Sequence, residues 1–214
     1  FLFLIIQLTA GAQDLDSVEL NEKLAIITSD SNDSAKAKSC NQLLRYYLNR
    51  NLDSAKLIAG MGLGFAKRIK WHKAEAVFTA GFGEIHSNRG LYDSAMFYYE
   101  RALGLNLKHG EKRNAASTYN NMASAASNLR SDYNSAANYL FKALELAEEA
   151  KDSLLIATCL HNISGIYLTQ KDFDKALSYE NKAFALARES GNTYEMANSL
   201  ITIGKIRYSI NAPD

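Results

Sequence analysis

The side chains that could ligate a metal ion or act as a general base are scattered along this sequence. The four histidines are His72, His86, His109 and His161. Because no HExxH motif and no close pair of histidines occurs, their spacing does not predict a metal site.

A glycine-rich run from Gly60 to Gly64 has the spacing of a phosphate-binding loop. Such a loop follows a strand, whereas these glycines fall inside a predicted helix. Neither a P-loop lysine nor a Gly-x-Ser-x-Gly motif is present. We interpret the run as a loosely packed helix crossing, in which each interior glycine costs about 1 kcal/mol relative to alanine. No catalytic residue and no cofactor is therefore predicted.

The composition favours long helices and argues against one class of partner. Of the 214 residues, 47% are apolar, which is ample for a buried core. Proline occurs once, at Pro213. Lysine and arginine number 24 against 23 acidic residues, so the positive excess of nucleic-acid-binding proteins is missing. We expect an all-α protein that does not bind nucleic acid.

Residues 1–12 have the pattern of a secretory signal peptide. The apolar segment FLFLIIQL is followed by Ala10-Gly11-Ala12 and then by polar residues. The segment is shorter than the about 20 residues that a membrane-spanning helix needs. We predict cleavage after Ala12 and export to the periplasm or the extracytoplasmic face of a bacterial membrane. The alternative is a buried first strand or helix.

Four segments share a large apolar residue, then Asp or Asn, any residue, and Ala. Their alanines, spaced by 40, 41 and 40 residues, are Ala55, Ala95, Ala136 and Ala176. The small residues that follow seven positions later are Gly62, Ala102, Ala143 and Ala183. Seven residues make two helical turns, so each small pair lies on one face, where a neighbouring helix can approach closely.

The residues around these alanines predict where helices begin and end. Candidates for the N-cap or first turn of a second helix are Asp53, Asp93, Asn134 and Asp174. The expected ends are near Lys70, His109, Lys151 and Ser190. A first helix precedes each anchor, with Gly83 and Ser164 at its small position. The third unit matches if one extra residue is allowed, which places Ala123 there.

Small residues at positions 8, 20 and 27 of each unit, with aromatic residues at 11 and 17, resemble the tetratricopeptide repeat. The residues that carry the resemblance best are Gly83, Tyr92, Ala95, Tyr99 and Ala102, and then Asn162, Ile163, Tyr167, Phe173, Ala176 and Ala183. The departures from the family pattern are Thr79, Asn120 and Leu160 at position 4 and Glu180 at position 24. The long period is similar to that of exported bacterial sensor and scaffold repeats.

This resemblance implies a right-handed superhelical solenoid of antiparallel helix pairs, with about 4.5 repeats. The expected units are 34–73, 74–113, 114–153 and 154–193, with a half unit at 194–214. Residues 13–33 are expected to be a lead-in or a capping helix. Asp214 falls where a second helix would open, so we expect the repeat to continue beyond it.

In tetratricopeptide repeat proteins the first helices line the groove that holds a partner. Carried over by position, the predicted partner-binding residues are Asn41, Asn120, Asn121, Thr158, His161, Asn162, Asn198, Thr202 and Lys205. Because asparagine both donates and accepts, a row of asparagines could grip the backbone of an extended peptide. The alternative is that they bond only within the repeat or to water. Exposed apolar side chains expected on this face are Tyr47, Leu168 and Tyr208.

The two cysteines fall in the first helices of the first and fourth units. Three helix-packing steps of about 8–10 Å each separate Cys40 from Cys159. A disulfide requires Cα atoms within about 7 Å. Both thiols are therefore expected to be free and buried.

We predict a non-catalytic module that binds a protein or a peptide. Its resemblance to exported repeats suggests the extracytoplasmic ligand-sensing or scaffolding part of a membrane-attached signalling protein, with attachment through a segment after residue 214. One alternative is a stand-alone periplasmic assembly scaffold without an output domain. Another is a hydrolytic enzyme with helical repeats, which would need convergent carboxylates.

Overall fold

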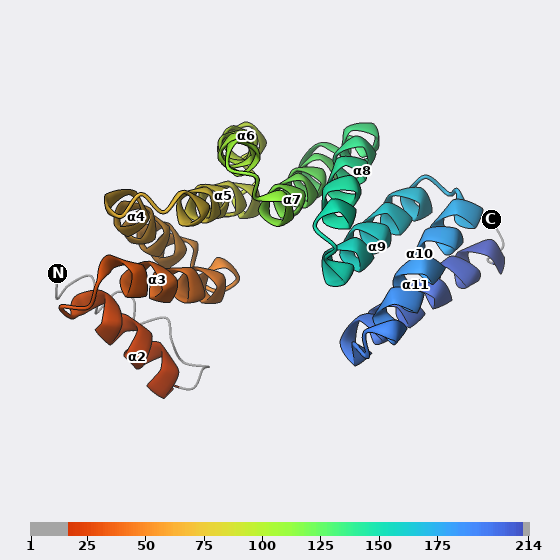
Figure 1. Cartoon of the computed structure of the whole chain (residues 1–214). Helices are drawn as coiled ribbons and strands as arrows, with labels where there is room; N and C mark the ends of the chain where they lie inside the picture. Colours follow the sequence, from red (N-terminus) through yellow and green to blue (C-terminus); the bar gives the residue numbers. More distant parts are fainter. Residues whose placement is uncertain (1–16, 212–214) are drawn as a thin grey trace. The chain divides into compact units, whose positions relative to one another are not determined.

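The computed structural model describes residues 17–211, and these residues are helical almost throughout (Figure 1). The helices are α2 (Ser17–Thr28), α3 (Asp33–Leu48), α4 (Leu52–Arg68), α5 (His72–Asn88), α6 (Tyr92–Lys108), α7 (Lys112–Arg130), α8 (Tyr133–Glu149), α9 (Ser153–Thr169), α10 (Phe173–Glu189) and α11 (Thr193–Asn211). No strand occurs between residues 17 and 211. The predicted all-α fold of helix pairs is confirmed. The predicted signal peptide, residues 1–12, lies outside the described residues.

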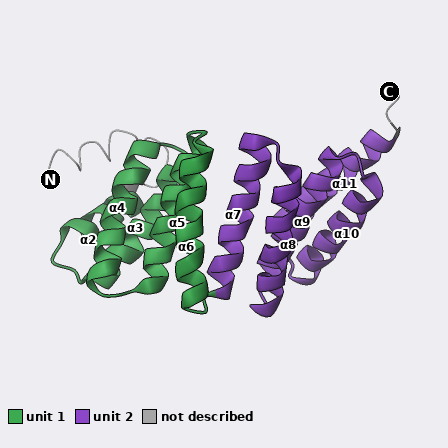
Figure 2. Ribbon diagram, turned by 90° about the horizontal axis from the view of Figure 1, so that it is seen from above, with its two compact units in different colours: residues 1–111 green, residues 112–214 purple. Residues whose placement is uncertain are grey.

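The chain divides into two compact units, which are described separately (Figure 2). Unit 1 is residues 1–111 and contains α2 to α6, whereas unit 2 is residues 112–214 and contains α7 to α11. The closest helix pairs are α3 with α4 and α5 with α6 in unit 1, and α7 with α8 and α9 with α10 in unit 2. Each is a first helix with the second helix of its own repeat.

Small residues let these helices approach closely. The four anchor alanines are 0% exposed. A Cβ atom added at Gly62 would stand 2.2 Å from Cζ of Phe78, and one at Gly83 would stand 2.5 Å from the ring of Tyr99. Gly62 is therefore tightly packed, and the interpretation of the whole glycine run as a loose crossing is wrong at this residue. Gly60 and Gly64 have open space instead.

The turns combine a side-chain cap with a left-handed residue. Asn51, Asp132 and Asp172 cap α4, α8 and α10 by accepting backbone N–H bonds. The four residues predicted as N-caps or first-turn residues are each the second residue of their helix, so they occupy the first turn. Between residues 17 and 211, the residues with positive φ are Lys70, Gly90, Gly110, Ser131, Lys151, Lys171 and Gly191. Each follows a helix and ends it.

The extra residue of the third repeat is accommodated at the end of its first helix. Helix α7 has 19 residues, whereas α5 and α9 have 17. The N–H of Asp132 bonds to the carbonyl oxygen of Ala126, six residues back, whereas the N–H of Asp172 bonds to Tyr167, five residues back. A wider last turn therefore takes up the insertion, and the later repeats keep their register.

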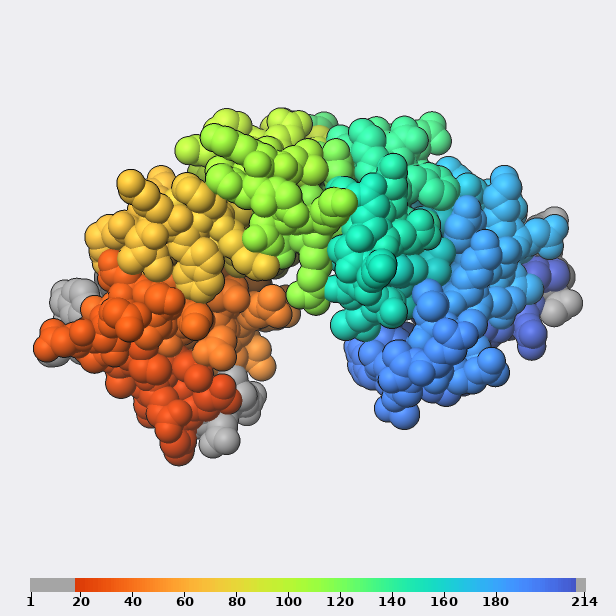
Figure 3. Space-filling view, viewed as in Figure 1, coloured from red at the N-terminus to blue at the C-terminus, as the bar shows by residue number. Residues whose placement is uncertain are grey.

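Helix α2 packs against α3, and the two surfaces meet in the space-filling view (Figure 3). Its residues Leu20, Leu24 and Ile27 are at most 5% exposed and belong to the same buried cluster as Tyr47. Among the described helices, none combines the length and the hydropathy that crossing a bilayer requires.

Candidate functional site

All nine predicted partner-binding residues lie on first helices. Asn41 is on α3 in unit 1, and the other eight are on α7, α9 and α11 in unit 2. The eight residues of unit 2 are Asn120, Asn121, Thr158, His161, Asn162, Asn198, Thr202 and Lys205. All are partly or fully exposed, so a ligand can reach them. Asn41 belongs to a separate unit and is not placed relative to the others.

Asn120 and Asn162 form a direct pair between α7 and α9. The Nδ2 of Asn162 donates to the Oδ1 of Asn120 across 2.7 Å. This bond uses one donor and one acceptor, and it leaves the amide NH₂ of Asn120 and the Oδ1 of Asn162 for a further partner. The pair therefore presents one donor group beside one acceptor. A single peptide unit presents the complementary C=O and N–H.

His161 is anchored from behind by a carboxylate of the second helix. Its Nδ1 lies 2.9 Å from Oε1 of Glu180 on α10, and Glu180 is 0% exposed. The hydrogen bond to Glu180 raises the pKa of His161, and desolvation opposes this effect. Glu195 and Lys205 on α11 act on the same ring with opposite signs. The imidazole side chain is 37% exposed, so it presents a held, chargeable group next to Asn162.

The remaining predicted residues differ in what they can offer. Thr158 donates its hydroxyl to the carbonyl oxygen of Leu154 in its own helix, at 2.9 Å. Asn121 is half-buried on α7, next to Asn120 in sequence. On α11, Asn198 and Thr202 are half-buried and Lys205 is exposed.

The structure corrects one expectation and adds two features. Tyr47 is 0% exposed, not a groove residue, because it lies in the buried cluster to which α2 contributes. Glu180 was noted only as a departure from the repeat at position 24, and the structure shows that its carboxylate contacts His161. His72 and His109 stack with ring centroids 4.3 Å apart, although 37 residues separate them. No group of three His, Cys, Asp or Glu side chains within residues 17–211 could hold a metal ion.

Two segments match family models. Residues 114–189 and residues 81–109 each match one described as tetratricopeptide repeat. These two segments therefore have the sequence of tetratricopeptide repeats. No curated protein matches the sequence.

Solved structures of similar fold support the same tetratricopeptide repeat (TPR) architecture. Aspartyl phosphate phosphatase F from Bacillus subtilis superposes with a TM-score of 0.74 at 16% identity, covering 84% of this chain and 47% of the phosphatase. A Rap protein complexed with competence and sporulation factor gives a TM-score of 0.71 at 15% identity, covering 80% of this chain and 51% of the Rap protein. The third structure is a signal transduction ATPase of the STAND class from Pyrococcus horikoshii, which has a tetratricopeptide repeat sensor. It gives a TM-score of 0.70 at 15% identity, covering 94% of this chain and 31% of the ATPase.

These likenesses establish the TPR-like fold and no more. The chain spans about half the length of the first two proteins and less of the third. Glu180 at position 24 is one of the departures from the tetratricopeptide repeat pattern, and it makes the contact with His161 described above.

Proposed function

We propose that this TPR chain is a peptide- or protein-binding module that holds an extended segment through the Asn120–Asn162 pair. The observation that carries the proposal is the pair's remaining hydrogen-bonding capacity, one NH₂ beside one carbonyl oxygen. An extended peptide backbone offers the matching acceptor and donor in every residue, so recognition would not depend on one side chain.

The neighbouring residues would add selectivity to backbone capture. His161 lies next to Asn162 and is held by Glu180 at 2.9 Å. In its protonated form the imidazole donates from both nitrogens, and Nε2 would favour a carbonyl or carboxylate acceptor of the ligand. The complex of a Rap protein with competence and sporulation factor supports a binding role for this fold.

The decisive test changes the hydrogen-bonding pattern of the pair and retains its shape. In an Asn162→Asp variant, the amide of Asn120 can turn to donate to the new carboxylate. The pair would then gain acceptor oxygens and keep only one free amide N–H, on Asn120, so it would lose most of its capacity to donate. We expect linear peptides selected from a random display library to lose about tenfold in affinity, the equivalent of one hydrogen bond. Fluorescence anisotropy with labelled peptides measures this change.

Asn138→Asp is the matched control, because Asn138 is exposed on α8 in the second-helix layer and the change in charge is the same. Unchanged affinity in Asn162→Asp would show that the pair does not hold the peptide. A library that yields no saturable binder would remove the peptide-binding function itself.

We further propose that the module works outside the cytoplasm, as a ligand-sensing or scaffolding part of a membrane-attached signalling protein. The support is the FLFLIIQL segment followed by Ala10-Gly11-Ala12, together with the use of such repeats as the sensor of the STAND protein. N-terminal sequencing of the natural protein from cells is expected to begin at Gln13. A mature chain that retains residues 1–12 would contradict export by this route.

A further inference from the structure

A second site lies in unit 1, away from the residues discussed so far. A cavity of about 530 Å³ opens among α4, α5 and α6. Its apolar lining comes from Leu63, Phe82, Tyr98 and Leu105. The rings of Phe82 and Tyr98 stack with centroids 5.4 Å apart, and Tyr98 also stacks on His86. The aromatic wall is thereby held in place.

Three cations surround this apolar wall. Lys67 on α4 and Arg101 and Lys108 on α6 line the cavity, and all three are exposed. None of the three side chains has a hydrogen-bond or ion-pair partner among residues 17–211. The one acidic group in the lining, Glu75, lies 3.8 Å from the ring of His72. The cavity therefore keeps an excess of positive charge.

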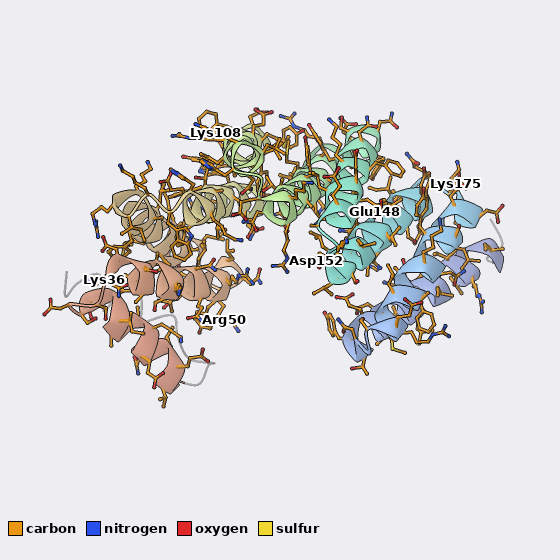
Figure 4. All side chains as sticks on the ribbon, viewed as in Figure 1. Lys36, Arg50, Lys108, Glu148, Asp152 and Lys175 are labelled. Carbon is orange, nitrogen blue, oxygen red and sulfur yellow. The ribbon has the colours of Figure 1, made fainter. Side chains whose placement is uncertain are left out.

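The repeat provides an internal comparison for this charge. Adding 81 residues, the spacing between Ala55 and Ala136, carries the cavity positions onto α8, α9 and α10 of unit 2. There Lys67 becomes Glu148, Arg101 becomes Lys182 and Lys108 becomes Glu189. Figure 4 labels Lys108 on α6 and Glu148 on α8.

The three cations of the cavity in unit 1 thus correspond to one cation and two anions at the equivalent positions of unit 2. The helix dipole favours Lys67 and Lys108 in the last turns of α4 and α6. It does not account for Arg101 in the middle of α6, nor for Glu148 at the end of α8. The positive charge is therefore specific to the cavity in unit 1.

A glycine forms part of the cavity wall. Gly104 lines the cavity, and a Cβ atom added there would meet nothing within 4 Å. The corresponding residue in unit 2 is Ala185. An interior helix glycine costs about 1 kcal/mol relative to alanine, and no packing contact at Gly104 offsets this cost. No side chain therefore projects from this position into the cavity.

We propose that this cavity binds a small anionic amphiphile, a molecule with an apolar body and a carboxylate head. The volume is in the range of small-molecule sites. The apolar and aromatic wall would bury the body, and the three cations would pair with the head by charge-assisted hydrogen bonds. The site is separate from the proposed peptide-binding residues, all but one of which belong to unit 2.

Two probes test the proposal: decanoate and decyltrimethylammonium share a ten-carbon chain and differ in charge. Each is titrated into the full-length protein by calorimetry, below the concentration at which it forms micelles. We expect saturable one-to-one binding of decanoate and at least about tenfold weaker binding of the cation. Equal binding of both probes would indicate adsorption to exposed apolar residues such as Ile201 and Tyr208 and would overturn the proposal. So would the absence of saturable decanoate binding.

Two pairs of variants localise the site. Lys67→Gln with Arg101→Gln is expected to weaken decanoate binding about tenfold or more, whereas Lys142→Gln with Lys182→Gln removes the same charge from unit 2 and should leave it unchanged. Gly104→Phe should fill the cavity and abolish binding without lowering the Tm, with Ala185→Phe as its control. Equal losses in the two units, or full binding by Gly104→Phe, would refute this location.

Discussion

The Nδ1 atom of His161 lies 2.9 Å from Oε1 of Glu180, a carboxylate that is 0% exposed, and this contact joins α9 to α10. The second carboxylate oxygen, Oε2, has no hydrogen-bond partner among the described residues. A buried carboxylate needs a compensating charge or donor. The imidazole supplies one, and its contribution depends on protonation.

The first prediction is that this contact stabilises the fold more at low pH. Because folding raises the pKa of His161, the folded chain binds the proton more tightly than the unfolded chain. The stabilisation is complete below the unfolded pKa of about 6.5 and is lost as the pH rises through the folded pKa. We expect the Tm difference between the wild type and His161→Gln to shrink from pH 6 to pH 8.

Thermal melts across this pH range provide the measurement. The charged neighbours on α11, Glu195 and Lys205, remain in both proteins, so only their interactions with the His161 ring, which have opposite signs, enter the difference. A Tm difference that stays constant or grows with pH would show that His161 is not held as a cation by Glu180.

The second prediction separates the three glycines of α4. Gly62→Ala is expected to destabilise the chain by about 1–3 kcal/mol, because its Cβ would stand 2.2 Å from the ring of Phe78. Gly60→Ala and Gly64→Ala should each stabilise it by about 0.5–1 kcal/mol, since both positions are helical and open. Urea unfolding measures all three. Similar effects at the three positions would contradict the described packing of α4 on α5.

The sequence predicted the architecture because the repeat is recorded in small residues. Ala55, Ala95, Ala136 and Ala176 must be small wherever a helix crosses, so their spacing is visible without coordinates. The single spacing of 41 correctly indicated the longer α7. The predicted ends of the second helices lie within one or two residues of the observed ends. The prediction succeeded because glycines and lysines, which are in the left-handed conformation in the structure, follow these helices.

The site was predicted less completely, because its contacts join different helices. Asn120 and Asn162 were identified as groove positions, but the bond between them was not predicted, because it joins two different repeats. Glu180 was noted only as a departure from the repeat. Tyr47 was assigned to the wrong surface, since α2 lies outside the repeat pattern and its cover over α3 leaves no periodic signal. The cavity lined by Arg101 depends on three helices and left no local motif.

A third prediction concerns the lysines that end helices in a left-handed conformation. Lys151 has φ 54° and follows α8, where a residue with a Cβ atom is strained by about 1 kcal/mol or more. Lys151→Gly is expected to be more stable than Lys151→Ala by about 1 kcal/mol. Comparing these two variants removes the lysine charge from both and isolates the backbone effect. Equal unfolding midpoints in urea would show that the turn carries no such strain.

The last prediction is that both thiols are inert in the folded chain. Cys40 and Cys159 are free and 0% exposed, and burial raises the pKa of each thiol to about 12. The reactive species is the thiolate, which is scarce at such a pKa and out of reach of reagents. Native protein treated with iodoacetamide at about pH 8 should remain unmodified by mass spectrometry, whereas protein in urea without reductant should gain two adducts. Rapid labelling of the native chain would show that α3 or α9 opens locally. A denatured chain that gains no adduct would reveal a disulfide between the two cysteines, which the repeat spacing excludes.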